Sequence, residues 1–186
     1  MRNARSTRKP MLATGLVAAA CSLALALPAR ADDEVKEAKD TVEVFTKADP
    51  GISKFFESSA GYAIFPTIGK GAIGIGGAGG SGVLFEKGKA VGKTSMAQVT
   101  IGLQLGGQSY SEVVFFETAA ALNDFKKGNF ALAAQVSAVA AASGASANAK
   151  YASGVAVFTA TKAGLMYEAS VGGQKFGYEP FDAKKK

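Results

Sequence analysis

The chain has 186 residues and a formal net charge of +6, with 21 lysine and arginine residues, 15 acids, one cysteine and no histidine or tryptophan. Without histidine, and with a single cysteine, it lacks the side chains for Ser-His-Asp or Cys-His catalysis, for the usual zinc sites and for haem ligation by histidine. Carboxylate pairs, a Ser-Lys dyad and all-oxygen metal sites are the enzymatic options that remain.

The first 31 residues have the three parts of a secretory signal peptide. A basic stretch precedes an apolar run from Met11 to Leu27, and Ala29-Arg30-Ala31 then forms an A-x-A cleavage site. The run is shorter than the roughly 20 residues of a membrane-spanning helix and is followed by Pro28, so cleavage is favoured over retention as an anchor. We therefore expect residues 1–31 to be a signal peptide and residues 32–186 to form one exported domain, periplasmic or associated with the outer membrane.

The only cysteine, Cys21, lies inside this apolar run and allows a second interpretation, in which it becomes the lipidated first residue of a lipoprotein. The match is poor, because Ala18 replaces the larger aliphatic residue expected three positions earlier and the run stays apolar after Cys21. Cleavage after Ala31 is the preferred interpretation.

Removal of the signal peptide changes the charge of the protein. Five of the 21 basic residues leave with it, so 16 lysines face 15 acids and the net charge falls to about +1. No arginine and no basic field remain to contact phosphates or guanine bases. We therefore expect no nucleic-acid partner.

Two helices are predicted at the start of the exported domain. From Asp32 to about Lys47, apolar residues recur at spacings of three and four, which places them on one helix face: Val35, Ala38, Val42 and Phe45. Asp49 and Pro50 are typical of an N-cap and a first helical residue, and they predict a second, short helix that ends at about Ser58.

From Gly61 onward, short β-rich runs separated by glycines predict a sheet. The expected strands are 62–66, 72–76, 82–86, 97–105, 112–117, 154–161 and 164–171. Lys87-Gly88-Lys89 predicts a hairpin turn, and Thr118 predicts the cap of a helix that stops at Gly128. The Ala-rich segment 130–142 alternates as a strand does, although alanine also favours helix. The predicted fold is α+β, with N-terminal helices packed on a mainly antiparallel sheet, open or barrel-like, and one inserted helix.

Residues 69–82, GKGAIGIGGAGGSG, place Gly74, Gly76 and Gly79 in a G-x-G-x-x-G spacing. A dinucleotide site requires a helix directly after such a loop, whereas the following residues 83–86 predict another strand. We interpret the glycines as positions where two strands, or a lipid, approach the backbone closely.

Five residues are candidates for contact with a membrane surface. Phe55 and Phe56 would insert as an apolar edge, while Lys47, Lys54 and Lys70 would meet anionic head groups. In the alternative interpretation, at least one of the two phenylalanines packs in the core.

The acidic residues show no pattern that would mark a catalytic centre. Neither Glu112 with Glu117 nor Asp49 with Glu57 has the spacing of an acid-base pair. We expect no catalytic residues, no metal and no cofactor.

Several sequence blocks resemble the SYLF domain family. They are SAGYAIFPTIGKG at 59–71, the glycine-rich 73–77 and 80–83, GLQLGGQ at 102–108 and VVFF at 113–116. Residues 157–166 depart from the family's tyrosine- and serine-containing segment but keep Gly164-Leu165. The resemblance implies a lipid-binding domain. Eukaryotic members bind phosphoinositide membranes and regulate actin, and bacterial members are exported envelope proteins, which would not meet actin.

The expected function is therefore non-catalytic binding of an anionic phospholipid or membrane surface in the periplasm or envelope. The alternative is a structural or protein-interaction module whose partner is another envelope protein. A third possibility, an enzyme, would require a cleft that holds a strongly perturbed acid or lysine.

Overall fold

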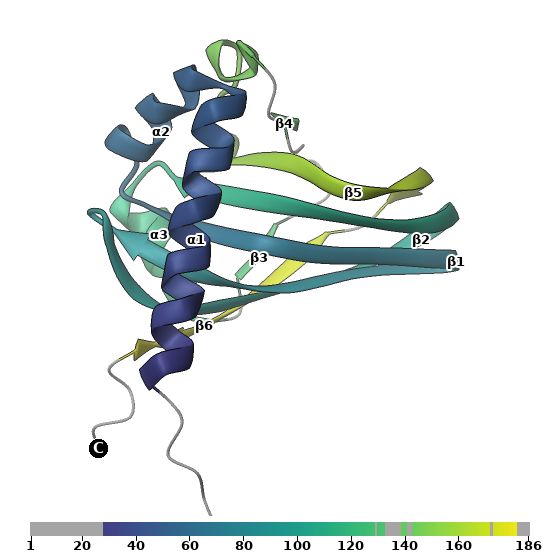
Figure 1. The fold of residues 1–186 in the computed structure, drawn as a ribbon, viewed down its shortest axis with the longest axis horizontal. Coiled ribbons are helices and arrows are strands. Elements are labelled where there is room, and N and C mark those ends of the chain that lie inside the picture. The colour runs from purple at the N-terminus through teal and green to yellow at the C-terminus, as the bar shows by residue number, and fades with distance from the viewer. Residues whose placement is uncertain (1–27, 129, 133–138, 141–142, 172, 182–186) are drawn as a thin grey trace, which may run out of the picture.

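The computed structural model describes residues 28–128, 130–132, 139–140, 143–171 and 173–181 (Figure 1). In chain order its elements are α1 (Pro28–Ala48), η1 (Pro50–Ile52), α2 (Ser53–Ser58), β1 (Gly61–Glu86), β2 (Lys89–Phe116), α3 (Ala119–Lys126), β3 (Phe130–Leu132), β4 (Val139–Ala140), η2 (Ala145–Ala147), β5 (Val155–Val171) and β6 (Gln174–Pro180). The predicted α+β class is confirmed. Most of the predicted signal peptide, including Cys21, lies outside the described residues.

A single long hairpin forms the centre of the sheet. β1 and β2 pair in antiparallel register from Gly61 opposite Phe116 to Glu86 opposite Lys89. The predicted turn is confirmed, because Lys87 and Gly88 both have positive φ, as a two-residue hairpin loop with right-handed twist requires. The prediction of separate strands at 62–66, 72–76 and 82–86 was wrong, and so was the division of 97–105 from 112–117. The glycines lie within continuous strands, and register shifts along the ladder absorb the irregularities.

The hairpin curls back on itself. Gly82 follows Ile64 by 18 residues, a separation that would span roughly 60 Å in a straight strand. A Cβ on Gly82 would nevertheless lie only 2.1 Å from the Ile64 carbonyl oxygen, and one on Gly80 would lie 2.5 Å from that of Thr67. The glycine-rich segment thus allows the two ends of β1 to touch, so the prediction of close backbone approach is confirmed. No helix follows the G-x-G-x-x-G spacing, because β1 continues to Glu86.

The curl divides the sheet into two halves. The base half consists of residues 61–71 of β1 and 107–116 of β2, together with β5, which pairs with β2. The return half consists of 76–86 of β1 and 89–99 of β2, together with β6 and β3. Within the described residues, the pairing is antiparallel except where the short β4 lies parallel to β5. The mainly antiparallel, barrel-like sheet is therefore confirmed as a curled half-barrel (Figure 1).

Two apolar clusters hold the halves together. One is lined by both halves and by the inserted helix, and its members include Phe65, Val114, Leu84, Met96, Phe176, Leu122 and Phe125. The other lies beneath the N-terminal helices and includes Phe45, Ile52, Ile64, Val83, Phe85, Phe115 and Phe158. Since both clusters draw residues from both halves, each depends on the curl.

The helices begin and end largely where the sequence predicts. α1 lies across the strands and begins four residues before the expected Asp32, and its predicted apolar face is confirmed by fully buried Ala38 and Phe45 (Figure 1). The second helix is a 3-10 turn followed by α2, capped as expected by Asp49. The Thr118 hydroxyl oxygen accepts a hydrogen bond from the Ala121 N–H at 3.2 Å, which confirms the cap of α3.

The last third of the chain differs more from expectation. The strands predicted at 154–161 and 164–171 are one strand, β5. Of the Ala-rich segment, 130–132 and 139–140 are strands, and residues 133–138 and 141–142 lie outside the described residues. β6 was not predicted, because Gly177 and Pro180 interrupt its short alternating pattern.

Candidate functional site

The structure brings together four of the five predicted membrane-contact residues. Lys47 lies in the last turn of α1, and Lys54, Phe55 and Phe56 lie on α2, which follows after η1. Lys70 lies on β1, nine residues beyond the start of the strand, or roughly 30 Å along it. The candidate site is therefore the region around α2, and Lys70 belongs to a different part of the molecule.

Phe55 and Phe56 face the sheet. The Phe55 ring lies 5.1 Å from that of Phe158 and 5.5 Å from that of Tyr151, and the Phe56 ring lies 4.9 Å from that of Tyr62. Both rings also contact Phe115, at 5.4 and 4.8 Å. Such aromatic contacts stabilise each pair by about 0.5–1.5 kcal/mol beyond the area buried. The core-packing alternative is confirmed for both side chains, which are half-buried.

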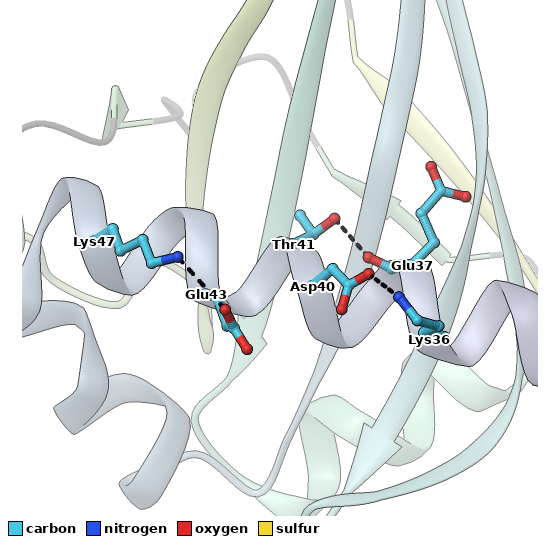
Figure 2. Close-up of polar contacts among 6 residues, drawn as sticks. All are labelled: Lys36, Glu37, Asp40, Thr41, Glu43 and Lys47. Atoms are coloured by element: carbon cyan, nitrogen blue, oxygen red, sulfur yellow. Dashed lines mark hydrogen bonds and ion pairs between the residues drawn. The ribbon is translucent and has the colours of Figure 1, made fainter.

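Lys47 lies on a helix surface with many acids. Its ammonium nitrogen is 3.5 Å from a carboxylate oxygen of Glu43, and Lys36 pairs in the same way with Asp40 at 2.6 Å (Figure 2). All four side chains are largely exposed, so screening by water leaves each pair little net effect on stability. An anionic head group that approaches Lys47 would also meet the Glu43 carboxylate, which weakens its predicted role.

A cleft lies between α2 and η2 and contains two of the predicted residues. Its volume is about 410 Å³, and its lining is Asp49, Pro50, Gly51, Lys54, Phe55, Gly144, Ser146 and Ala147. The cleft joins residues separated by nearly a hundred positions in the sequence. Its lining combines an exposed lysine, a phenylalanine and two glycines, a set of residues suited to a ligand with an anionic and an apolar part.

Asp49 holds the two walls of this cleft together. One carboxylate oxygen accepts hydrogen bonds from the backbone N–H groups of Gly51 at 3.1 Å and Gly144 at 3.4 Å, and the other accepts from that of Ser146 at 2.6 Å. These bonds, that from Ser146 above all, hold the pKa of Asp49 below its usual value despite burial. The Asp49 carboxylate is thus a structural anion. Its capping role was predicted, but its bond to residues 95 or more positions away carries no local signal.

Lys70 acts on a buried acid. This acid is Glu112, which is 1% exposed. Burial raises the pKa of Glu112 to about 7, and the hydrogen bond from Gln174 and the positive charge of Lys70 both oppose this rise. Glu112 is the strongly perturbed acid that the enzyme hypothesis requires. Glu112 is not among the residues that line the α2 cleft or two further clefts, which lie at residues 34–37 and at residues 93–95.

Two general properties of the described residues bear on function. No group of three or more His, Cys, Asp or Glu side chains among them is placed to hold a metal ion. No helix in the described part of the chain combines the length and apolar character needed to cross a membrane.

The curled sheet, its helix-covered face and the inserted α3 define an α+β half-barrel domain. Residues 97–179 match the family described as Ysc84, Las17-binding protein actin regulator. This part of the chain is therefore similar to the Ysc84, or SYLF, family, and it includes two of the blocks that carry the resemblance, GLQLGGQ at 102–108 and VVFF at 113–116.

A curated bacterial protein is also similar. Beta cell expansion factor A of Aeromonas veronii is 29% identical over 129 residues, which cover 68% of this chain and 49% of that protein. The chain thus spans about half the length of this relative.

Proposed function

We propose that this chain is an exported, non-catalytic SYLF protein that binds the surface of an anionic membrane through the α2 region. The cleft of about 410 Å³ carries the proposal, because its lining includes both Lys54, which is exposed, and Phe55, which is half-buried. A lysine near an anionic surface contributes roughly 1 kcal/mol. The similarity of residues 97–179 to the Ysc84, or SYLF, family supports this proposal, through the lipid binding that the resemblance implies.

Only part of the predicted contact set remains in this proposal. Lys54 is the exposed cation, and Phe55 is the aromatic residue in the lining of the cleft. Phe56 and Lys47 have a neighbouring, secondary position, and Lys70 is too distant to contact the same surface patch. A headgroup phosphate at Lys54 with an acyl or glycerol segment against Phe55 is the arrangement that we propose.

Co-sedimentation with phosphatidylglycerol vesicles at low salt tests the proposal. Lys54→Glu reverses one charge, a change of about two charge units, and should weaken binding by roughly 2 kcal/mol or about 30-fold. Lys39→Glu makes the same change on the exposed side of α1 and should leave binding within about threefold. If the unmodified protein stays in the supernatant, membrane binding is refuted. Equal losses for the two variants would refute α2 as the contact.

A protein partner is the second candidate, favoured by the family description, which names binding to the protein Las17. A photo-crosslinking residue in place of Glu57, which is exposed on α2 three residues after Lys54, would separate the two. A discrete band of higher mass in envelope extracts would indicate a protein, whereas adducts that are extracted with lipid would indicate the membrane. We propose no nucleic-acid partner.

Location is tested by the intact mass of the exported protein. We propose cleavage after Ala31, which gives a chain that begins at Asp32. A chain that begins at an acylated Cys21 would instead show a lipoprotein tethered to the membrane.

A further inference from the structure

A buried hydrogen bond connects the two halves of the sheet. Glu112 lies in the base half, on β2, and its Oε2 atom accepts a hydrogen bond of 2.8 Å from Nε2 of Gln174 on β6. Gln174 pairs in the ladder with Gln98, in the return half of the same strand β2. Fourteen residues separate Gln98 from Glu112, or roughly 46 Å if β2 were straight. The bond therefore exists only while the sheet is curled.

The other carboxylate oxygen of Glu112 has no such contact. Oε1 is buried and, within the described residues, has no hydrogen-bond partner. An ionised oxygen in that position costs far more than a protonated one, because an unpaired charge loses its hydration without compensation. The site therefore accommodates a neutral carboxyl group at a lower cost than a carboxylate.

We propose that Glu112 and Gln174 form a protonation-controlled latch that keeps the return half of the sheet closed against the base half. With Glu112 neutral the latch is closed. When Glu112 is ionised, Oε1 requires water, and β6 separates from the base half to admit it.

The groups that face Glu112 support this mechanism. On β1 the directly opposite residue is Phe65, on β5 it is Thr159, and β6 contributes Gln174, none of which is charged. Tyr110, two positions earlier on the same face of β2, is also buried. Lys70 on β1 is the charged group among the described residues that acts on Glu112, and its effect is smaller than that of burial.

The direction of the pH effect follows from the raised pKa of Glu112. Between the ordinary value of 4.5 and the folded value of about 7, the closed form holds a proton that the open form releases. Closure is therefore favoured at low pH and is progressively lost as pH rises to about 7, after which the ratio no longer changes. For one group with these two values, the ratio of open to closed forms rises at most about 25-fold between pH 5.5 and 8.0.

Amide hydrogen exchange on the full chain measures this opening. Protection factors, already corrected for the intrinsic pH dependence of exchange, should fall five- to 25-fold for the amides of 175–179 between pH 5.5 and 8.0. Those of 62–64 and 113–115, which pair within the base half, should change less than twofold. Unchanged protection of β6 in the unmodified protein, or an equal loss in both segments, would overturn the latch.

Glu112→Gln is the matched variant, because it keeps the shape and the acceptor for Gln174 but cannot ionise. It should keep the low-pH protection of β6 at both pH values, and a loss like that of the unmodified protein would show that another group is responsible. Gln174→Leu removes the donor and should lower β6 protection at pH 5.5. The pH comparison on the unmodified protein can refute the latch without any variant. The proposal therefore remains testable even if a variant fails to fold. Neither result bears on membrane binding at α2.

Discussion

Replacement of Gly82 by alanine tests the curl directly. The new Cβ would lie 2.1 Å from the Ile64 carbonyl oxygen and 2.8 Å from Cδ1 of the Phe65 ring. Ordinary contact requires the strands to separate by more than about 1 Å, and the obstacle is backbone rather than a flexible side-chain end. Overpacking of this kind costs roughly 1–3 kcal/mol, and we expect the upper end because both contacts lie in the buried interior.

Gly71 provides the matched control in the same strand. A Cβ there would meet nothing within 4 Å. Since glycine in a strand interior is about 0.5–1 kcal/mol less favourable than alanine, Gly71→Ala should be neutral or stabilising. The two substitutions are chemically identical, so opposite effects on the free energy of unfolding would be due to the position alone.

Urea unfolding followed by circular dichroism is the appropriate measurement. With a slope of about 2 kcal/mol per molar urea, a loss of 3 kcal/mol lowers the midpoint by roughly 1.5 M. Gly71→Ala should leave the midpoint unchanged or raise it slightly. If Gly82→Ala unfolds within about 0.2 M of Gly71→Ala, the two ends of β1 are not in the contact described, and the curled arrangement is refuted.

Three further substitutions test other parts of the fold. Asp49→Ala leaves the three N–H donors of the α2 cleft without their acceptor and should cost about 3 kcal/mol at pH 7. The pKa of Asp49 is lowered in the folded state, so its contribution to the free energy of unfolding is complete above the ordinary pKa of 3.8 and is lost as pH falls through the folded value. Urea titrations should therefore show a smaller difference between variant and parent at pH 3 than at pH 7. Thr118→Ala should cost about 1 kcal/mol through loss of the α3 cap, and an equal loss in Thr118→Ser would argue against the capping role. Phe115→Ala removes the ring shared by Phe55 and Phe56 and should cost about 3–5 kcal/mol, with increased exchange of the α2 amides as the accompanying sign.

The parts of the fold that depend on local signals were predictable. The Asp49-Pro50 start, the Lys87-Gly88 turn and the Thr118 cap each depend on the conformational preference of one or two residues, and all three are confirmed. The length of β1 was not predictable. Glycine interrupts the period-two pattern of a strand both where the chain turns and where two strands approach closely, so the pattern does not distinguish the two cases. The contact of Gly82 with Ile64 decides between these, and it is non-local.

The candidate site was predictable only in its composition. Phe55 and Phe56 are adjacent on a short helix, a pattern that suits either an exposed edge or a core contact. The rings of Phe115 and Phe158 decide for the core, and they come from distant strands. Glu112 carried no signal at all, because a lone acid in a strand becomes perturbed only when another half of the sheet covers it. The residue types predicted which side chains could bind a ligand or ionise, and their burial in the folded sheet determined which of them lie at the surface.

The position of α1 across both halves of the sheet implies an order of folding. The β1–β2 hairpin can form from its turn, because each pair closes a short loop. The surface beneath α1, by contrast, includes Ile64 from one half and Val83 from the other, so it does not exist before the hairpin has curled. Docking of α1 is therefore a late event, even though α1 leaves the ribosome first. In a chain whose α1 is held apart from the sheet, the hairpin would still curl, but the apolar surface around Ile64 and Val83 would stay exposed to water.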